Sequence, residues 1–69
     1  MTVLQIKGQH AVLEVSLVDL VIINNAISEA IHLLSIGDFH PRIGGSVEEA
    51  KTLRDNIGRV IDQMPQTDG

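Results

Sequence analysis

Three histidines are the residues of this sequence best suited to binding a metal ion. His10, His32 and His40 lie far apart in the chain, and no His-x-x-x-His pair directs two imidazoles at one ion from a single helix. Asp38 and His40 together supply only two ligands, whereas a zinc site takes at least three from the protein. The spacing predicts solvent-facing histidines, no metal site and no cofactor. A metal or small-ligand site is the last-ranked hypothesis.

The segment Arg42-Ile43-Gly44-Gly45-Ser46 is a second candidate site, because glycines and an arginine before a helix can bind an anion. However, Ser46 and Glu49 have the spacing of a capping box, which occupies free backbone N–H groups. Glu48 and Glu49 also place negative charge where the anion would lie. The segment is therefore interpreted as a turn before a capped helix.

Catalytic residues are not predicted. Cysteine is absent, and Ser16 and Ser46 stand at positions where serine caps a helix. The acidic residues fall on predicted solvent-facing helix surfaces, where a raised carboxyl pKa is not expected. A chain of 69 residues also offers little room for a pocket of about 300 Å³ or more. We expect the protein not to be an enzyme.

The composition limits the kinds of partner. Hydrophobic residues make up 43% of the chain, which argues against intrinsic disorder, and the net charge is −4. Nucleic-acid binders show a basic stripe or aromatic stacking platforms, and Phe39 is the only aromatic residue. The apolar run around Val21-Ile22-Ile23 is far shorter than a membrane span, and the first residues lack a signal-peptide pattern. The sequence predicts a cytoplasmic protein that binds neither nucleic acid nor membranes.

A β-hairpin is predicted for residues 2–15. Gly8-Gln9 is a two-residue loop with glycine at its first central position, as a type II′ turn requires. Lys7 then pairs with His10, and the pairing continues to Thr2 opposite Val15. One face of the hairpin becomes almost wholly apolar, and we expect it to pack on the first helix. Its members are Ile6, Ala11, Leu4, Leu13, Thr2 and Val15.

The first helix is predicted for residues 17–36, with Ser16 as its N-cap. Apolar residues recur at helical spacing along one side: Leu20, Ile23, Ile27, Ala30, Ile31 and Leu34. Val18, Ile22 and Leu33 widen this stripe beyond what one small hairpin covers. This surplus of apolar surface on the first helix predicts a homodimer that buries part of the helix, since a twofold dimer is the commonest closed assembly.

Residues 37–45 connect the first helix to the second. Gly37 is expected to end the first helix in the left-handed conformation. The connector is predicted to be a loop or a short edge strand, because Pro41 lacks a backbone donor. Phe39 and Ile43 are expected to anchor it to the core.

The second helix is predicted to begin after Ser46 and to end before Pro65, and residues 66–69 are expected to form a disordered tail. Its predicted buried stripe consists of Val47, Ala50, Leu53, Ile57, Val60, Ile61 and Met64. Residues 1–65 thus form one small α+β domain of order β-β-α-α. In it, an N-terminal β-hairpin packs on a long helix, and a connector leads to the second helix.

Two residues inside the helices allow two interpretations each. Asn24 either flanks the core without a specific role or makes a directional hydrogen bond to a neighbour or a second subunit. Gly58 costs roughly 1 kcal/mol relative to alanine in a helix. Either the helix tolerates this cost, or another backbone packs closely against the glycine.

The segment from Asp38 to Ala50 contains an acidic-Phe-x-x-Arg-x-Gly pattern followed by Ser-Val-Glu-Glu-Ala, with Asn24-Asn25-Ala26-Ile27 before it. This pattern resembles small bacterial proteins without assigned function, some of which accompany polymorphic toxin systems as candidate immunity proteins. The resemblance covers most of the chain after the hairpin and implies no particular functional residues. It favours an immunity role.

The first functional hypothesis is a non-catalytic protein-binding module, most concretely an immunity or antitoxin-like protein that binds a toxin or other basic partner. Its acidity and small size motivate this hypothesis. The candidate partner-binding residues are Asp38, His40, Arg42, Glu48 and Glu49. The alternative is a structural or regulatory homo-oligomer that associates through the first helix.

Overall fold

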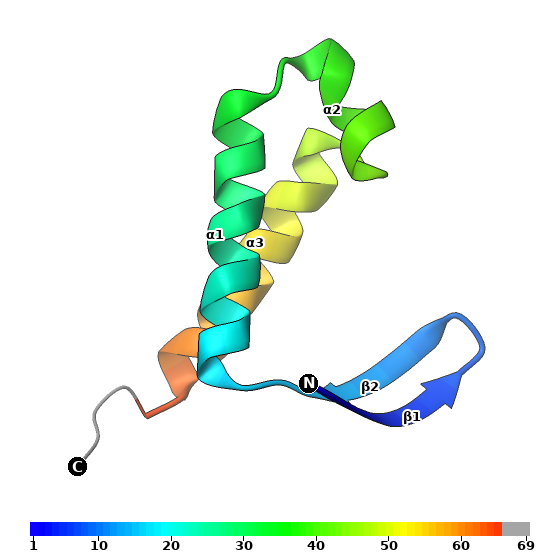
Figure 1. Ribbon diagram of the computed structural model, residues 1–69, viewed down its shortest axis with the longest axis vertical. Coiled ribbons are helices and arrows are strands. Elements are labelled where there is room, and N and C mark those ends of the chain that lie inside the picture. Colours follow the sequence, from blue (N-terminus) through cyan, green and yellow to red (C-terminus); the bar gives the residue numbers. More distant parts are fainter. Residues whose placement is uncertain (66–69) are drawn as a thin grey trace.

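A two-stranded antiparallel hairpin precedes three helices in the computed structural model, which describes residues 1–65 (Figure 1). The α+β class and the β-β-α-α order are confirmed, with one additional short helix in the connector. The tail expected at residues 66–69 lies outside the described residues.

Two helices of 17 residues each, α1 (Leu17–Leu33) and α3 (Val47–Gln63), lie side by side and form the body of the protein (Figure 1). The predicted cap of α1 is present, because the Ser16 hydroxyl accepts a hydrogen bond from the backbone N–H of Asp19 at 3.1 Å. This bond satisfies an N–H group that has no partner inside the helix. Leu34 ends α1 in an extended conformation, earlier than the predicted end at residue 36.

The connector is not a loop or a strand but a third helix, α2 (Ile36–Ile43). Phe39 explains why: its side chain is 1% exposed, and the helical turn carries it into the contact with α1 and α3. Pro41 lies inside α2, where its lack of a donor removes one helical hydrogen bond. Gly44 ends α2 in the left-handed conformation with φ 89°. The expectation that Gly37 adopts this conformation is wrong, because Gly37 lies within α2.

The hairpin consists of β1 (Thr2–Lys7) and β2 (His10–Glu14). Gly8 has φ 58°, and no non-glycine residue among residues 1–65 has a positive φ, so Gln9 does not and the turn is of type II′, as predicted. The predicted pairing is found from Lys7 opposite His10 to Gln5 opposite Val12. A bulge between Val3 and Gln5 then shifts the register by one residue, so that Val3 pairs with Leu13 instead of Glu14.

This bulge sorts the side chains of the hairpin by polarity. Residues directly opposite each other in a ladder share a face of the sheet. One face carries the Ile6–Ala11 and Val3–Leu13 pairs, with Leu4 as the extra residue of the bulge. We call these five residues, Val3, Leu4, Ile6, Ala11 and Leu13, the apolar hairpin face. The opposite face carries the mostly polar residues Thr2, Gln5, Lys7, His10, Val12 and Glu14.

The structure corrects the expected packing of this hairpin on the first helix. Every residue of β1 and β2 is exposed, and the hairpin extends away from the end of the helix pair where α1 begins (Figure 1). The reason is that α1 packs its apolar stripe on α3, a partner of equal length, which leaves that stripe unavailable to the strands. The amino group of Met1 lies 3.5 Å from the Asp19 carboxylate and links the hairpin to α1.

The core of the described residues is small. Phe39 and Ala50 are the buried side chains, and Leu53 and Val60 of the predicted stripe are exposed by 51% and 48%. The molecule measures 43 × 32 × 15 Å. Its hairpin is a single layer, because every strand residue is exposed and no helix packs on it, whereas domains usually bury their core between at least two layers.

Candidate functional site

The residues predicted to bind a partner lie around α2 and the first turn of α3, at the end of the helix pair opposite the hairpin (Figure 1). All five are exposed. His40 and Glu48 line one depression together with Lys51 and with the apolar residues Ile36, Phe39 and Val47. Glu48 also forms an ion pair with Lys51, whose Nζ lies 3.9 Å from the carboxylate. These side chains of mixed charge present a polar surface, which we call the α2 surface.

Glu49 has a structural role at this end of α3. Its carboxylate accepts a hydrogen bond from the Ser46 backbone N–H at 3.0 Å, and its own N–H donates to the Ser46 hydroxyl at 3.0 Å. The predicted capping box is thus complete. The hydrogen bonds from Ser46 lower the pKa of the Glu49 carboxyl, and the nearby His40 lowers it further. Because this carboxylate is already engaged, it contributes to a partner surface mainly through its charge.

Asp38 and Arg42 stand one turn apart on α2 and outside the depression that His40 and Glu48 line. The Asp38 carboxylate accepts a hydrogen bond from the Ser35 hydroxyl at 3.1 Å, next to the N-terminus of α2. Arg42 lies in the last turn. The structure therefore brings His40, Glu48 and Glu49 together and leaves Asp38 and Arg42 at the margin of the α2 surface.

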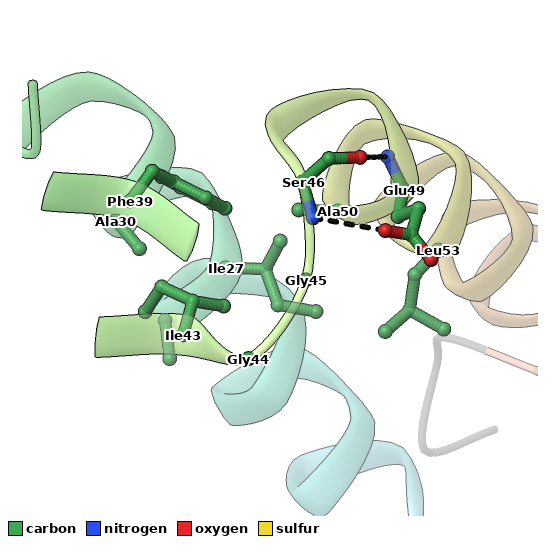
Figure 2. A pocket seen from close by; sticks show the side chains of 11 residues that line it. Ile27, Ala30, Phe39, Ile43, Gly44, Gly45, Ser46, Glu49, Ala50 and Leu53 are labelled. Carbon is green, nitrogen blue, oxygen red and sulfur yellow. Dashed lines mark hydrogen bonds between the residues drawn. The ribbon is translucent and has the colours of Figure 1, made fainter. Parts of the chain in front are cut away.

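An apolar depression of about 390 Å³ lies between α1, α2 and the start of α3 (Figure 2), so the expectation that the chain has little room for a pocket of this volume is wrong. Ile27, Phe39, Ile43 and Leu53 line it, and Gly44-Gly45 forms part of its rim. Its polar side chains are Ser46 and Glu49, each of which accepts a hydrogen bond from the backbone N–H of the other residue in the capping box (Figure 2). The Gly44–Ser46 segment thus behaves as a turn that leads into a capped helix, as its sequence predicts.

The three histidines lie on three different elements. His10 is at the start of β2, His32 is in the last turn of α1 and His40 is on α2. Within residues 1–65, no three His, Cys, Asp or Glu side chains gather in an arrangement that could hold a metal ion.

The apolar hairpin face is uncovered, although the sequence predicted that Leu4, Ile6, Ala11 and Leu13 of this face, but not Val3, would pack on the first helix. Ile6 is 65% exposed and Leu13 is 42% exposed. The two strands also have unpaired outer edges, since the sheet contains only β1 and β2. Exposed apolar faces and open strand edges are features of protein-interaction surfaces.

A second apolar patch begins beside the hairpin, on the first two turns of α1. Val18 is 67% exposed and Ile22 is 60% exposed, consistent with the surplus apolar residues that the sequence shows on this helix. Met1 and Ile22 line the same depression together with Asp19 and Ile23. The start of β1 and the exposed patch of α1 are therefore neighbours on one surface.

Comparison with protein-family models, with curated proteins and with solved structures finds no match to this chain. None of the helices among residues 1–65 is both long and apolar enough to cross a lipid bilayer. Two surfaces of the described residues are candidates for binding a partner, the α2 surface at one end of the helix pair and the apolar hairpin face at the other.

Proposed function

We propose that this protein is a non-catalytic protein-binding module. The observation that carries the proposal is the apolar hairpin face, whose large side chains have no partner within the described chain. An isolated two-stranded hairpin is marginally stable in water, and it needs a further strand or a packed helix to persist. Each Å² of apolar surface that a partner covers contributes about 25 cal/mol. A protein that packs on this face stabilises the hairpin and is bound by it.

A protein partner fits this surface better than a small molecule does. Small ligands bind in concave pockets that enclose most of their surface. The apolar hairpin face lies instead on a thin, two-stranded sheet with two open edges. Such a sheet offers backbone hydrogen bonds and apolar contacts to another polypeptide.

The most concrete form of this function is an immunity or antitoxin-like protein that binds a toxin or another basic partner. The net charge of −4 supports it, because an acidic surface accelerates encounter with a basic protein. The α2 surface supplies the binding residues Asp38, His40, Arg42, Glu48 and Glu49. The resemblance of the segment from Asp38 to Ala50 to candidate immunity proteins supports the same proposal.

The second candidate is a structural or regulatory homo-oligomer. The observation that favours it is the exposed patch on α1, where Val18 and Ile22 stand beside the hairpin. A homodimer that buries part of the first helix would cover this patch. The two candidates are compatible, because the α2 surface and the hairpin lie at opposite ends of the helix pair.

Co-expression with the product of the adjacent gene tests the proposal. We expect the purified proteins to bind in calorimetry and the full-length chain to protect cells if that product is toxic. Replacing both Glu48 and Asp38 with lysine should weaken binding of a basic partner at least tenfold, and the matched double change to glutamine should weaken it less. The proposal fails if the wild-type chain associates neither with this product nor with itself.

A further inference from the structure

We infer that the apolar hairpin face is covered by the same face of a second copy of this chain. The inference rests on the proposed protein-binding function and names the partner of one of its two surfaces. In this dimer, two hairpins stack face to face about a twofold axis. The α2 surface of each copy remains free at the far end.

The surface area of the chain is the first argument. Its accessible surface is 5470 Å², whereas a compact folded monomer of this size exposes ~4200 Å². The surplus of ~1200 Å² per chain is more than the ~800 Å² that each partner buries in a stable interface of standard size. The radius of gyration of 13.8 Å likewise exceeds the ~11 Å expected for 69 residues. The surplus is that of the whole chain, and one dimer interface of standard size accounts for about two thirds of it.

The uncovered two-stranded sheet is the second argument. Every residue of β1 and β2 is exposed, so the sheet has no second layer that buries its apolar face. Two hairpins that stack at the usual sheet separation of about 10 Å create this second layer from identical parts. Pairing of the strand edges alone would extend the sheet but leave the apolar hairpin face in water. Face-to-face stacking is therefore the arrangement that the exposed side chains favour.

The charge distribution is the third argument. The chain as a whole carries a net charge of −4, which opposes self-association. Between Thr2 and Glu14, however, Lys7 and Glu14 balance each other, and the apolar hairpin face itself carries no charge. The repulsive charge lies on the helical part of the chain, so stacked hairpins bring two uncharged faces together.

Light scattering of the full chain across a hundredfold dilution tests the dimer. We expect the mass of two chains at high concentration and dissociation on dilution. Leu13→Asp places a charge in the proposed interface and should raise the dimer dissociation constant at least ~100-fold. Leu53→Asp is the matched control, because Leu53 is also about half exposed but belongs to the apolar depression near α2. It should change the constant less than about twofold.

Circular dichroism separates loss of the interface from loss of folding, since Leu13 lies outside the contact of α1 with α3 and its variant should keep the helical signal. Single cysteines then locate the interface in this cysteine-free chain. Ala11→Cys on the apolar hairpin face should be joined by a short bismaleimide, and His10→Cys on the polar face should not.

Two results would overturn the inference. One is a wild-type chain that stays monomeric at every concentration, and the other is a dimer that Leu13→Asp leaves intact. If the chain is monomeric but Leu13→Asp weakens binding of the adjacent gene's product, only the identity of the covering partner is wrong. If no association depends on the apolar hairpin face or the α2 surface, the proposed function fails as well.

Discussion

Gly58 on α3 faces the side-chain amide of Asn24 on α1, and a β-carbon placed on Gly58 would lie 4.0 Å from Asn24 Nδ2. This distance is an ordinary van der Waals contact with a side chain, so no neighbouring backbone requires a glycine there. This contact favours the first of the two interpretations of Gly58: the helix tolerates the cost of the glycine, and no close packing of another backbone requires it. Asn24 Oδ1 is buried without a hydrogen-bond partner within the described chain, so its oxygen makes no directional hydrogen bond there.

Gly58→Ala should therefore stabilise the protein. Alanine is about 1 kcal/mol more favourable than glycine inside a helix, and the structure has room for the methyl group. Urea denaturation followed by circular dichroism at fixed protein concentration should show an increase of about this size in the free energy of unfolding. A decrease would mean that α1 and α3 approach more closely at Asn24 than the structure shows.

Gly44→Ala and Gly37→Ala should have opposite effects, although both changes add one methyl group near α2. Gly44 has φ 89°, a left-handed conformation that costs an L-residue about 1–2 kcal/mol. Gly37 lies inside α2 without a positive φ and with open space around it, so alanine should stabilise the helix there. Urea denaturation of the two variants in parallel shows whether each change raises or lowers the free energy of unfolding. Equal effects would contradict the assignment of Gly44 as the residue that ends α2.

Phe39→Ala should destabilise the protein more than any other single truncation in α2. Phe39 is 1% exposed, and replacing a buried phenylalanine with alanine typically costs about 3–5 kcal/mol. For a domain of marginal stability, this cost should abolish the cooperative thermal transition. Ile36→Ala is the control, because Ile36 is 87% exposed and its truncation should leave the transition nearly unchanged. Similar transitions in both variants would show that α2 is not anchored through Phe39.

Stability should fall in acid partly through Glu49. The folded-state pKa of this carboxyl lies below its ordinary value of 4.5, because Ser46 donates hydrogen bonds to the ionised form. The stabilising contribution is therefore fully present above pH 4.5 and is lost as the pH falls through the lower folded-state pKa. Glu49→Gln keeps a capping side chain but cannot ionise.

The wild-type protein should accordingly have a larger free energy of unfolding than Glu49→Gln at pH 7. The free energies of the two proteins should converge as the pH falls below the ordinary carboxyl pKa of 4.5. Urea denaturation at a series of pH values measures this difference. Glu48→Gln is the control for a carboxylate in the same helical turn that makes no capping bond. A difference between wild type and Glu49→Gln that does not change with pH would contradict the role assigned to the ionised cap.

The candidate site was only partly predictable from the sequence. The capping box of Ser46 and Glu49 follows from a spacing of three residues, and the structure contains it. The apolar hairpin face could not be recognised as exposed, because an alternating apolar pattern indicates a covered face without identifying what covers it. The bulge at Leu4 was not predicted either, since an uninterrupted strand from Thr2 to Lys7 already places Leu4 and Ile6 on one face and leaves only Val3 on the polar side.

The sequence by itself determined the features that depend on neighbours within one helical turn or one hairpin loop. Ser16 caps α1, Ser46 caps α3 and Gly8 makes the type II′ turn, because each of these requires only a local backbone geometry. The tertiary structure decided whether the connector is a helix, because burial of Phe39 against α1 and α3 outweighs the cost of Pro41 inside α2. It also decided that α1 packs on α3 rather than on the hairpin. An apolar stripe can pack on only one partner, and a helix of equal length covers it more completely than a two-stranded sheet does.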